Sequence, residues 1–268
     1  MPINRDLTYF YRPRDPGTYM YHCHFEETEH VHMGMTGPCF VTPLRNEGAT
    51  RLGGNLDAEY MGYVYDDDST AYHREYIMLL TEVWTASHWS DSHIQLPEWS
   101  EYSPEFHLLN GRVWPDTILP NGAGHNPATH DLLPPNDPVT GAPIDRLQFQ
   151  PVSSLVQCNA GEKVLFRIIN LGFEHQSMRL QGIKMRVVGK DATFLRGRNG
   201  ADLSYETNTV AIGPGESMDV IFTAPDTPGT YLFYNRDYTR LNNGGGTGKG
   251  GQMTEVRVFP EGTLVPQT

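Results

Sequence analysis

The sequence predicts an all-β protein in which short strands pack as a β-sandwich, and three observations support this fold class. Runs of alternating apolar and polar residues recur along the 268 residues, with Gly and Pro turns between them, as is typical of sandwiches. No segment shows a sustained helical period. An internal repeat indicates that the sandwich unit occurs more than once.

The N-terminal part is predicted to hold three strands around a polar stretch. Residues 7–12 alternate in the manner of a strand, and residues 13–17 contain the Pro and Gly of a turn. Residues 18–22 are aromatic and β-branched, which favours a second strand. After the polar stretch, residues 39–42 are expected to form a closing strand that ends at Pro43.

Two segments that follow depart from this regular pattern. Residues 44–72 are rich in Gly, Asp, Asn and Tyr and are interpreted as an interdomain connection. Strands are expected at 74–83 and 105–109, but the rest of residues 84–146 is a loop insertion longer than compact domains usually contain. This insertion contains His88, His93, His107, His125 and His130. Since none of them forms a His-x-His pair, we interpret them as surface or structural residues.

From residue 147 the strand pattern becomes regular again. The expected strands are 152–157, 163–170, 177–181, 184–189, 207–212, 218–224, 230–235 and 253–259. Gly and Pro turns separate them, so a complete sandwich domain is predicted within residues 73–262.

An internal repeat relates the two ends of the chain. Residues 225–234 repeat residues 13–22 at a constant offset, and both copies contain Pro-Gly-Thr-Tyr. In the later copy, at least five strands are expected between residues 152 and 212, before the turn at 213–216. The corresponding turn of the earlier copy falls on the first residues of the sequence, so these strands have no counterpart there. We therefore expect residues 1–43 to be the end of a second sandwich, either truncated at its N-terminus or completed by strands from elsewhere.

The stretch YHCHFEETEHVHMGM, residues 21–35, concentrates the ligands that soft metal ions prefer. A thiolate and a thioether beside imidazole form a copper ligand set, and a His₂Cys site with a weak axial Met is the blue-copper arrangement. Cys23, His30 and Met35 fit this order, because Met35 follows His30 by the five residues that such loops keep. Met33 is the weaker alternative to Met35, and His32 has no Met at that spacing.

The two histidines that flank the cysteine are predicted to serve another centre. Successive side chains of a strand point to opposite faces, so His22 and His24 face away from Cys23. One strand end would then hold ligands for two metal centres. In the later copy these positions are occupied by residues 234–236, Tyr-Asn-Arg, so that copy is predicted to be copper-free.

This HCH segment, with His and Met after it, resembles the laccase-like multicopper oxidases, and the resemblance covers nearly the whole chain. It implies cupredoxin-like Greek-key β-sandwiches, one partial and one complete. Cys23 would belong to a type-1 copper, and His22 and His24 to the type-3 pair of a type 2/type 3 trinuclear site. The Gly-Glu-x-Met-Asp-Val pattern of the second unit is similar to the copper-free middle domain of three-domain members. One departure is that His30 follows Cys23 by seven residues, two more than in the common laccase loop.

The resemblance implies an oxidase that takes single electrons from a small-molecule or metal-ion donor and reduces O₂ to water. Such a cluster needs four His-x-His pairs and the type-1 site needs an upstream histidine, so the isolated chain is expected to be inactive. Further cupredoxin strands, domains or another subunit would supply the rest. His175 stands where a copper-bearing copy would carry upstream ligands, but we interpret it as a buried or interfacial structural residue. The alternatives are a copper nitrite reductase and an electron-transfer cupredoxin.

The composition excludes some partners. A net charge of −12 without a basic block argues against nucleic acid and anionic membrane surfaces. No apolar run is long enough for a transmembrane helix, and the chain as written carries no signal peptide. An extracellular or periplasmic location is nevertheless expected for the full-length protein. Cys39 and Cys158 are expected to be small buried hydrophobes rather than a disulfide.

Overall fold

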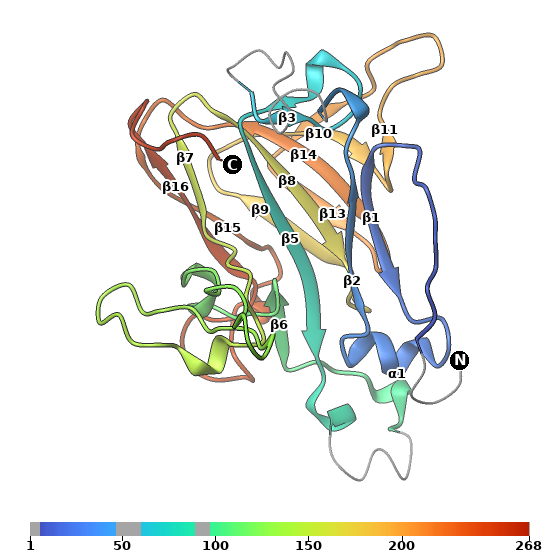
Figure 1. The fold of residues 1–268 in the computed structure, drawn as a ribbon, viewed down its shortest axis with the longest axis vertical. Coiled ribbons are helices and arrows are strands. Elements are labelled where there is room, and N and C mark those ends of the chain that lie inside the picture. The colour runs from blue at the N-terminus through green and yellow to red at the C-terminus, as the bar shows by residue number, and fades with distance from the viewer. Residues whose placement is uncertain (1–5, 47–59, 89–96, 268) are drawn as a thin grey trace.

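The computed structural model describes residues 6–46, 60–88 and 97–267, and its main feature is a pair of β-sheets packed face to face (Figure 1). The larger sheet has the order β11 (Thr193–Phe194), β10 (Met185–Lys190), β14 (Ser217–Thr223), β8 (Lys163–Asn170), β5 (Arg74–Val83) and β6 (Phe106–Leu109), with β12 (Tyr205–Thr207) also paired to β10. The smaller sheet has the order β13 (Thr209–Ile212), β9 (Gln176–Leu180), β15 (Gly229–Asn235), β16 (Met253–Phe259) and β7 (Val156–Asn159). Strand β5 is parallel to β8, and β7 is parallel to β16. The predicted β-sandwich is therefore confirmed.

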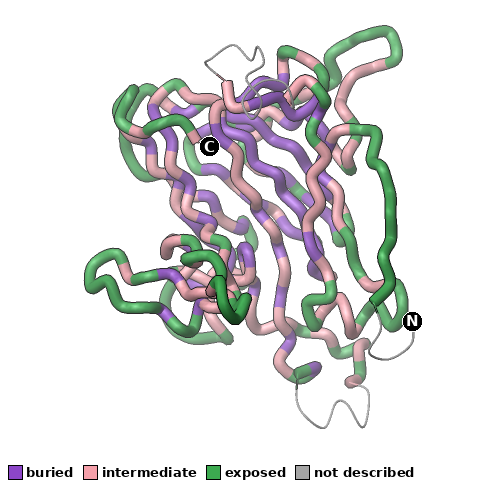
Figure 2. Tube along the Cα trace, in the orientation of Figure 1, coloured by how far each residue is buried: buried purple, intermediate pink, exposed green. Residues whose placement is uncertain are grey.

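The core of the sandwich forms where apolar side chains of the two sheets meet. In β8, Val164, Phe166 and Ile168 alternate toward this core and are fully buried. The ring of Phe166 lies edge-on to Phe222 of β14 and Phe233 of β15, at 5.0 Å between centroids in both cases. Burial of each such side chain stabilises the fold by roughly 1.5–3 kcal/mol. Figure 2 shows that the buried stretches follow the strands of the sandwich.

The predicted connection, residues 44–72, contains ordered structure where it is described. Strands β3 (Gly62–Tyr63) and β4 (Ala71–Tyr72) form a small antiparallel hairpin. Between them, Tyr65 is buried, and its hydroxyl donates to Asp219 of β14 at 2.6 Å. This part of the connection is thus packed against the larger sheet.

The N-terminal hairpin forms a separate two-stranded sheet. Strand β1 (Gly17–His22) pairs antiparallel with β2 (Thr36–Val41), and the hairpin lies beside the larger sheet (Figure 1). The strand predicted at residues 7–12 is wrong, because this segment is irregular and Phe10 is 96% exposed. Alternation alone does not make a strand, since a ladder also needs a hydrogen-bonded neighbour, and no strand in the described residues pairs with this segment.

The structure contains a short helix, α1 (Glu27–His32), which was not predicted from the sequence because no segment shows a sustained helical period. Acidic Glu27 and Glu29 lie in its first turn, and histidines lie in its last turn, as the helix dipole favours. Six residues are too few to show a helical period in the sequence.

The single strand predicted at residues 207–212 is also wrong in detail. The chain forms β12 and β13 here, and these strands belong to different sheets: β12 pairs with β10, and β13 pairs with β9. The crossing between the sheets depends on long-range pairing, which a local pattern does not contain.

The insertion at residues 84–146 contains β6 and several 3₁₀ turns, and is packed around a buried arginine. The guanidinium of Arg112 donates to the backbone oxygens of Gln150, Asp116, Leu119 and Pro120, at 2.8–3.2 Å. The 3₁₀ helices of the described chain are η1 (Leu44–Asn46), η2 (Asp68–Thr70), η3 (Thr85–His88), η5 (Trp99–Glu101), η6 (Asp116–Ile118), η7 (Asp145–Leu147) and η8 (Tyr238–Arg240). None of the helices in the described residues is long and apolar enough to span a membrane.

Candidate metal centre

The strand that leads into the candidate centre has the same anchor in both copies of the repeat. The hydroxyl of Tyr19 donates to the backbone oxygen of Asp15 at 2.9 Å. In the later copy, the hydroxyl of Tyr231 donates to the backbone oxygen of Thr227, also at 2.9 Å. Both tyrosines form the corner that ties a strand to the chain before it, as in other sandwiches. The sequence repeat is therefore a structural repeat.

The loop after β1 is closed by backbone hydrogen bonds between the predicted ligands. The N–H of Cys23 donates to the oxygen of Met35 at 3.0 Å, and the N–H of Met35 donates to the oxygen of His30 at 2.8 Å. These bonds hold the beginning, middle and end of the loop together. The three residues predicted as type-1 ligands are thus linked through the main chain.

The side chains of Cys23 and His30 meet in this loop. Cys23 Sγ lies 3.2 Å from His30 Nδ1 and accepts the N–H of Phe25 at 3.4 Å. The other ring nitrogen of His30, Nε2, lies 3.6 Å from the carboxylate of Glu26. A carboxylate behind a histidine orients the ring and makes it a better ligand.

The distance between the two donor atoms suits a shared metal ion. Bonds of about 2.0–2.3 Å to one ion place two ligand atoms roughly 3.1–3.6 Å apart, and Cys23 Sγ and His30 Nδ1 are separated by 3.2 Å. A thiolate and an imidazole are donors that copper accepts in both common oxidation states. The residues present therefore fit copper.

The choice of the methionine remains a prediction. Met33 ends α1 and Met35 follows it, and both side chains are exposed, at 36% and 56%. The backbone hydrogen bond between Cys23 and Met35 holds the main chain of Met35 beside Cys23. This supports Met35 over Met33 as the axial residue.

The flanking histidines, His22 and His24, lie together at the end of β1. Their rings are stacked at 5.7 Å between centroids, and both residues are exposed. His22 Nδ1 lies 2.8 Å from the backbone oxygen of Cys23. A carbonyl oxygen only accepts, so Nδ1 carries the proton and Nε2 keeps a lone pair for a metal.

His32 has a different environment from His30, although both belong to α1. Its Nε2 accepts the backbone N–H of Trp84 at 3.1 Å. Partial burial, with a smaller effect from nearby His88, lowers the pKa of His32. His32 is thus bound to the second domain, a role that no sequence signal indicated because Trp84 is far away along the chain.

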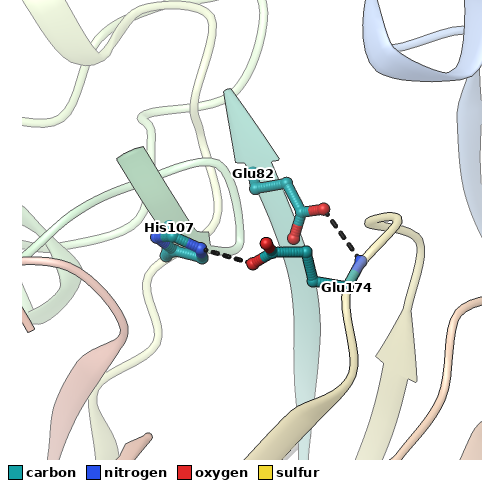
Figure 3. Close-up of side chains that lie close together, drawn as sticks. All are labelled: Glu82, His107 and Glu174. Carbon is teal, nitrogen blue, oxygen red and sulfur yellow. Dashed lines mark hydrogen bonds and ion pairs between the residues drawn. The ribbon is translucent and has the colours of Figure 1, made fainter. Parts of the chain in front are cut away.

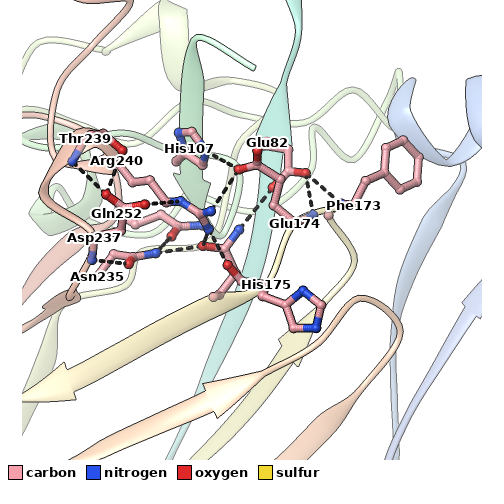
Figure 4. A network of polar contacts seen from close by, with 12 residues as sticks. Glu82, His107, Phe173, Glu174, His175, Asn235, Asp237, Thr239, Arg240 and Gln252 are labelled. Carbon is pink, nitrogen blue, oxygen red and sulfur yellow. Dashed lines mark hydrogen bonds and ion pairs between the residues drawn. The ribbon is translucent and has the colours of Figure 1, made fainter. Parts of the chain in front are cut away.

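In the later copy, the position of Cys23 is occupied by Asn235, which belongs to a buried polar network (Figure 4). Its Nδ2 donates to Gln176 at 2.6 Å and to Gln252 at 2.7 Å. Arg240 also donates to Gln176 at 2.6 Å. The three amide side chains are fully buried and use their polar groups on one another. This is a structural network, and it supports the prediction of a copper-free second unit.

Glu82, His107 and Glu174 form a second group close enough to hold a cation (Figure 3). However, His107 Nε2 already pairs with Glu174 at 3.1 Å, and Arg240 pairs with the same carboxylate at 3.1 Å. The carboxylate of Glu82 accepts backbone and side-chain donors, among them the N–H of Phe173 at 2.6 Å. The group therefore continues the structural network.

The other histidines have mixed outcomes. His107 is buried and structural, and His88, His125 and His130 are exposed, as predicted, whereas His93 lies outside the described residues. His175 was expected to be buried or interfacial, and the structure contradicts the first alternative, since this residue is exposed. His175 precedes β9, whose first residue, Gln176, accepts from Asn235 and Arg240 within the network. The ring of His175 points away from the network (Figure 4).

Comparisons with known proteins identify the class of this fold and site. Residues 74–255 match a family model described as Multicopper oxidase, and residues 1–45 match a second model with the same description. The chain therefore belongs to the multicopper oxidase family, and the laccase-like assignment is confirmed. The predicted cupredoxin-like fold is confirmed as well.

The sequence relatives are plant laccases. Laccase-5 of Arabidopsis thaliana is 30% identical over 92 residues, which is 34% of this chain and 15% of that protein. Laccase-12 of the same plant is 31% identical over 90 residues, or 33% and 15% of the two chains. The matched part spans about 15% of these relatives.

Solved structures agree on the fold. The blue copper oxidase from Nitrosomonas europaea has a TM-score of 0.60 at 21% identity, covering 92% of this chain and 57% of that one. The multicopper oxidase mgLAC has a TM-score of 0.58 at 22% identity, with coverages of 94% and 58%. The copper nitrite reductase from Nitrosomonas europaea has 0.54 at 15% identity, with coverages of 92% and 64%.

Proposed function

We propose that this chain contributes a type-1 copper site and part of a type 2/type 3 trinuclear site to an oxidase that reduces O₂ to water. Cys23, His30 and Met35 would bind the type-1 copper, and His22 and His24 would bind the trinuclear site. Membership of the multicopper oxidase family indicates copper-dependent oxidoreductase chemistry. The electron donor would be a small molecule or a metal ion.

The observation that carries the proposal is the pair formed by Cys23 Sγ and His30 Nδ1, 3.2 Å apart. Two stacked histidines flank this cysteine in the sequence. If the strand alternation continues through Cys23 and His24, this strand end would present soft donors on one side and imidazoles on the other. A loop held only for structural reasons would not need this set of donors.

Copper, when bound, supplies the one-electron redox chemistry. The chain supplies the positions of the ligand side chains and the protonation states of their donor atoms. The N–H of Phe25 would stabilise the negative charge of a Cys23 thiolate, and the carboxylate of Glu26 lies 3.6 Å from His30 Nε2, where it would favour one orientation of the ring. The carbonyl oxygen of Cys23 fixes the proton of His22 on Nδ1, so that Nε2 is available as a ligand.

The remaining copper ligands would come from residues other than His22, Cys23, His24, His30 and Met35. We propose that residues 1–43 are the end of a copper-binding cupredoxin unit, 44–72 a connection, and 73–262 a copper-free unit with an insertion at 84–146. The upstream histidine of the type-1 site and three further His-x-His pairs would be supplied by other cupredoxin strands, a further domain or another subunit.

The type-1 assignment is tested by the visible absorption of the copper-loaded protein. Cys23→Ser should abolish the intense thiolate-to-copper band, because an alcohol does not supply the soft, charge-donating ligand. Cys39→Ser is a matched control, since Cys39 is the other cysteine of the same hairpin and is also half-buried. A band that survives Cys23→Ser would overturn the assignment.

The trinuclear assignment is tested by oxygen consumption. His22→Ala or His24→Ala should stop O₂ uptake and leave the type-1 band, whereas loss of the band with O₂ uptake intact would contradict it. Four coppers per complete site would support the oxidase, and one would indicate an electron-transfer cupredoxin. Turnover of nitrite in place of O₂ would indicate a copper nitrite reductase, for which a metal ligand at His24 is not needed.

A further inference from the structure

Helix α1 connects the candidate copper ligands to the second domain. It carries His30, whose Nδ1 lies 3.2 Å from Cys23 Sγ, and two residues later His32, whose Nε2 accepts the N–H of Trp84 at 3.1 Å. Trp84 follows directly after β5 of the larger sheet. The same short helix therefore touches the candidate site and the sandwich.

The second domain surrounds His32 with aromatic rings. Centroid distances to His32 are 5.1 Å for His88, 5.8 Å for Trp99, 5.7 Å for Tyr102 and 5.9 Å for Phe173. Trp99, Tyr102 and Phe173 also contact one another. Stacked and edge-on aromatic pairs of this kind have preferred geometries, so this aromatic box holds the imidazole in one orientation.

Helix α1 needs such an anchor. It has six residues, none of which is buried, and helices this short are not stable in isolation. Its position must come from contacts with the rest of the protein. A loop that is free to move would also let His30 move relative to Cys23.

We propose that His32 is a positioning residue, which docks α1 into the aromatic box and thereby sets the placement of His30 beside Cys23. The copper-free domain then acts as a scaffold for the ligand loop. The tests that measure copper affinity or absorption rest on the proposed function. The placement of His30 can also be measured in the metal-free protein, and that test does not depend on the proposed function.

A second contact between hairpin and sandwich provides a matched control. Thr18, at the far end of β1 from Cys23, donates to Asp219 at 2.5 Å and accepts from Arg167 at 3.1 Å. Ser217 donates to the backbone oxygen of Thr18 at 2.7 Å. Loss of this contact should loosen the hairpin without touching the ligand loop.

The test compares three variants of the full protein. In His32→Leu, copper affinity should fall about 10- to 100-fold, the range for residues that orient a metal ligand, and the thiolate band should shift. His32→Gln keeps an acceptor near the position of Nε2 and should restore most of the affinity. Thr18→Val should lower the stability to urea but leave affinity and band position unchanged.

A metal-free measurement separates this inference from the copper assignment. In the apo protein, alkylation of Cys23 by iodoacetamide, followed by peptide mass spectrometry, should be several-fold faster in His32→Leu, because His30 no longer covers the sulfur. His32→Gln and Thr18→Val should react like the wild type.

Equal affinities and alkylation rates in His32→Leu and the wild type would overturn the inference. Equal losses of copper affinity in His32→Leu and Thr18→Val would also overturn it, since the effect would then come from loosening the whole interface between the hairpin and the sandwich. If the wild type gives no band that depends on Cys23, the copper site is wrong, and the alkylation rates still decide whether His32 positions the loop.

Discussion

The β1–β2 and β15–β16 hairpins begin alike and end differently. Each starts at the Gly of Pro-Gly-Thr-Tyr, and each has a tyrosine corner at 2.9 Å. After the strand, the first hairpin presents Cys23 in a loop at the protein surface. The second presents Asn235 inside a fully buried amide network.

If the first hairpin binds copper as proposed, this difference shows which residues specify metal binding. The strand and its anchor are shared, so they are compatible with either outcome. The residues at the end of the strand decide whether donor groups stay near the surface, as those of Cys23, His22 and His24 do, or are used within a buried network, as those of Gln176 and Gln252 are. Function in such scaffolds is carried by the loops that a rigid sheet positions.

The largest expected difference between the two regions is in thiol reactivity. Cys158 lies in the core of the second domain, where burial raises its pKa to about 12. The thiolate is the reactive form, so at pH 8 alkylation of Cys158 should be at least ~100-fold slower than that of Cys23. Peptide mass spectrometry after iodoacetamide treatment measures both rates, and comparable rates would refute the contrast. The reaction of Cys158 should appear as the pH approaches 12.

The next expected difference is in how much each of the two equivalent positions, Asn235 and Cys23, contributes to the stability of the fold. Asn235→Leu removes the donor to the buried oxygen of Gln252 and one of the two donors to Gln176, where Arg240 remains, and should lower the free energy of unfolding by about 2–4 kcal/mol. In the apo protein, Cys23→Ala should cost no more than about 1 kcal/mol, because Cys23 is only half-buried. Urea unfolding measures both variants. Equal losses would mean that the first loop is as tightly packed as the second.

The smallest effect should be the same in both copies. Tyr19→Phe and Tyr231→Phe each remove one hydroxyl that donates to a backbone oxygen at 2.9 Å. Each should lower the free energy of unfolding by about 0.5–1.5 kcal/mol. Clearly unequal losses in thermal or urea unfolding would show that the two corners are not equivalent.

Strands in which apolar and polar residues alternate, or which are continuously apolar, could be predicted from the sequence. The strands predicted at 74–83, 163–170 and 253–259 agree with the bounds of β5, β8 and β16. Residues 7–12 alternate as well, but the described chain offers no paired strand to them. The break between β12 and β13 depends on which sheet each strand joins, and local sequence does not contain that information.

The candidate site could be predicted in part. The spacing of Cys23 and His30 pointed to a pair, and the structure places their donor atoms 3.2 Å apart. Helix α1 and the docking of His32 were not predictable, because the helix is shorter than a measurable period and its partner, Trp84, comes from the second domain. The spacing of Met35 favoured it, and its role as a ligand remains a prediction.

Copper X-ray absorption spectroscopy tests the central claim, that the first hairpin binds copper through Cys23, most directly. We expect a single short copper–sulfur distance in the copper-loaded wild type, together with nitrogen ligands, and loss of this sulfur in Cys23→Ser. His30→Ala should remove a nitrogen ligand and bleach the visible band, whereas Met35→Leu should keep the band and raise the reduction potential. A wild-type spectrum with nitrogen and oxygen ligands only, or an unchanged sulfur distance in Cys23→Ser, would contradict the claim.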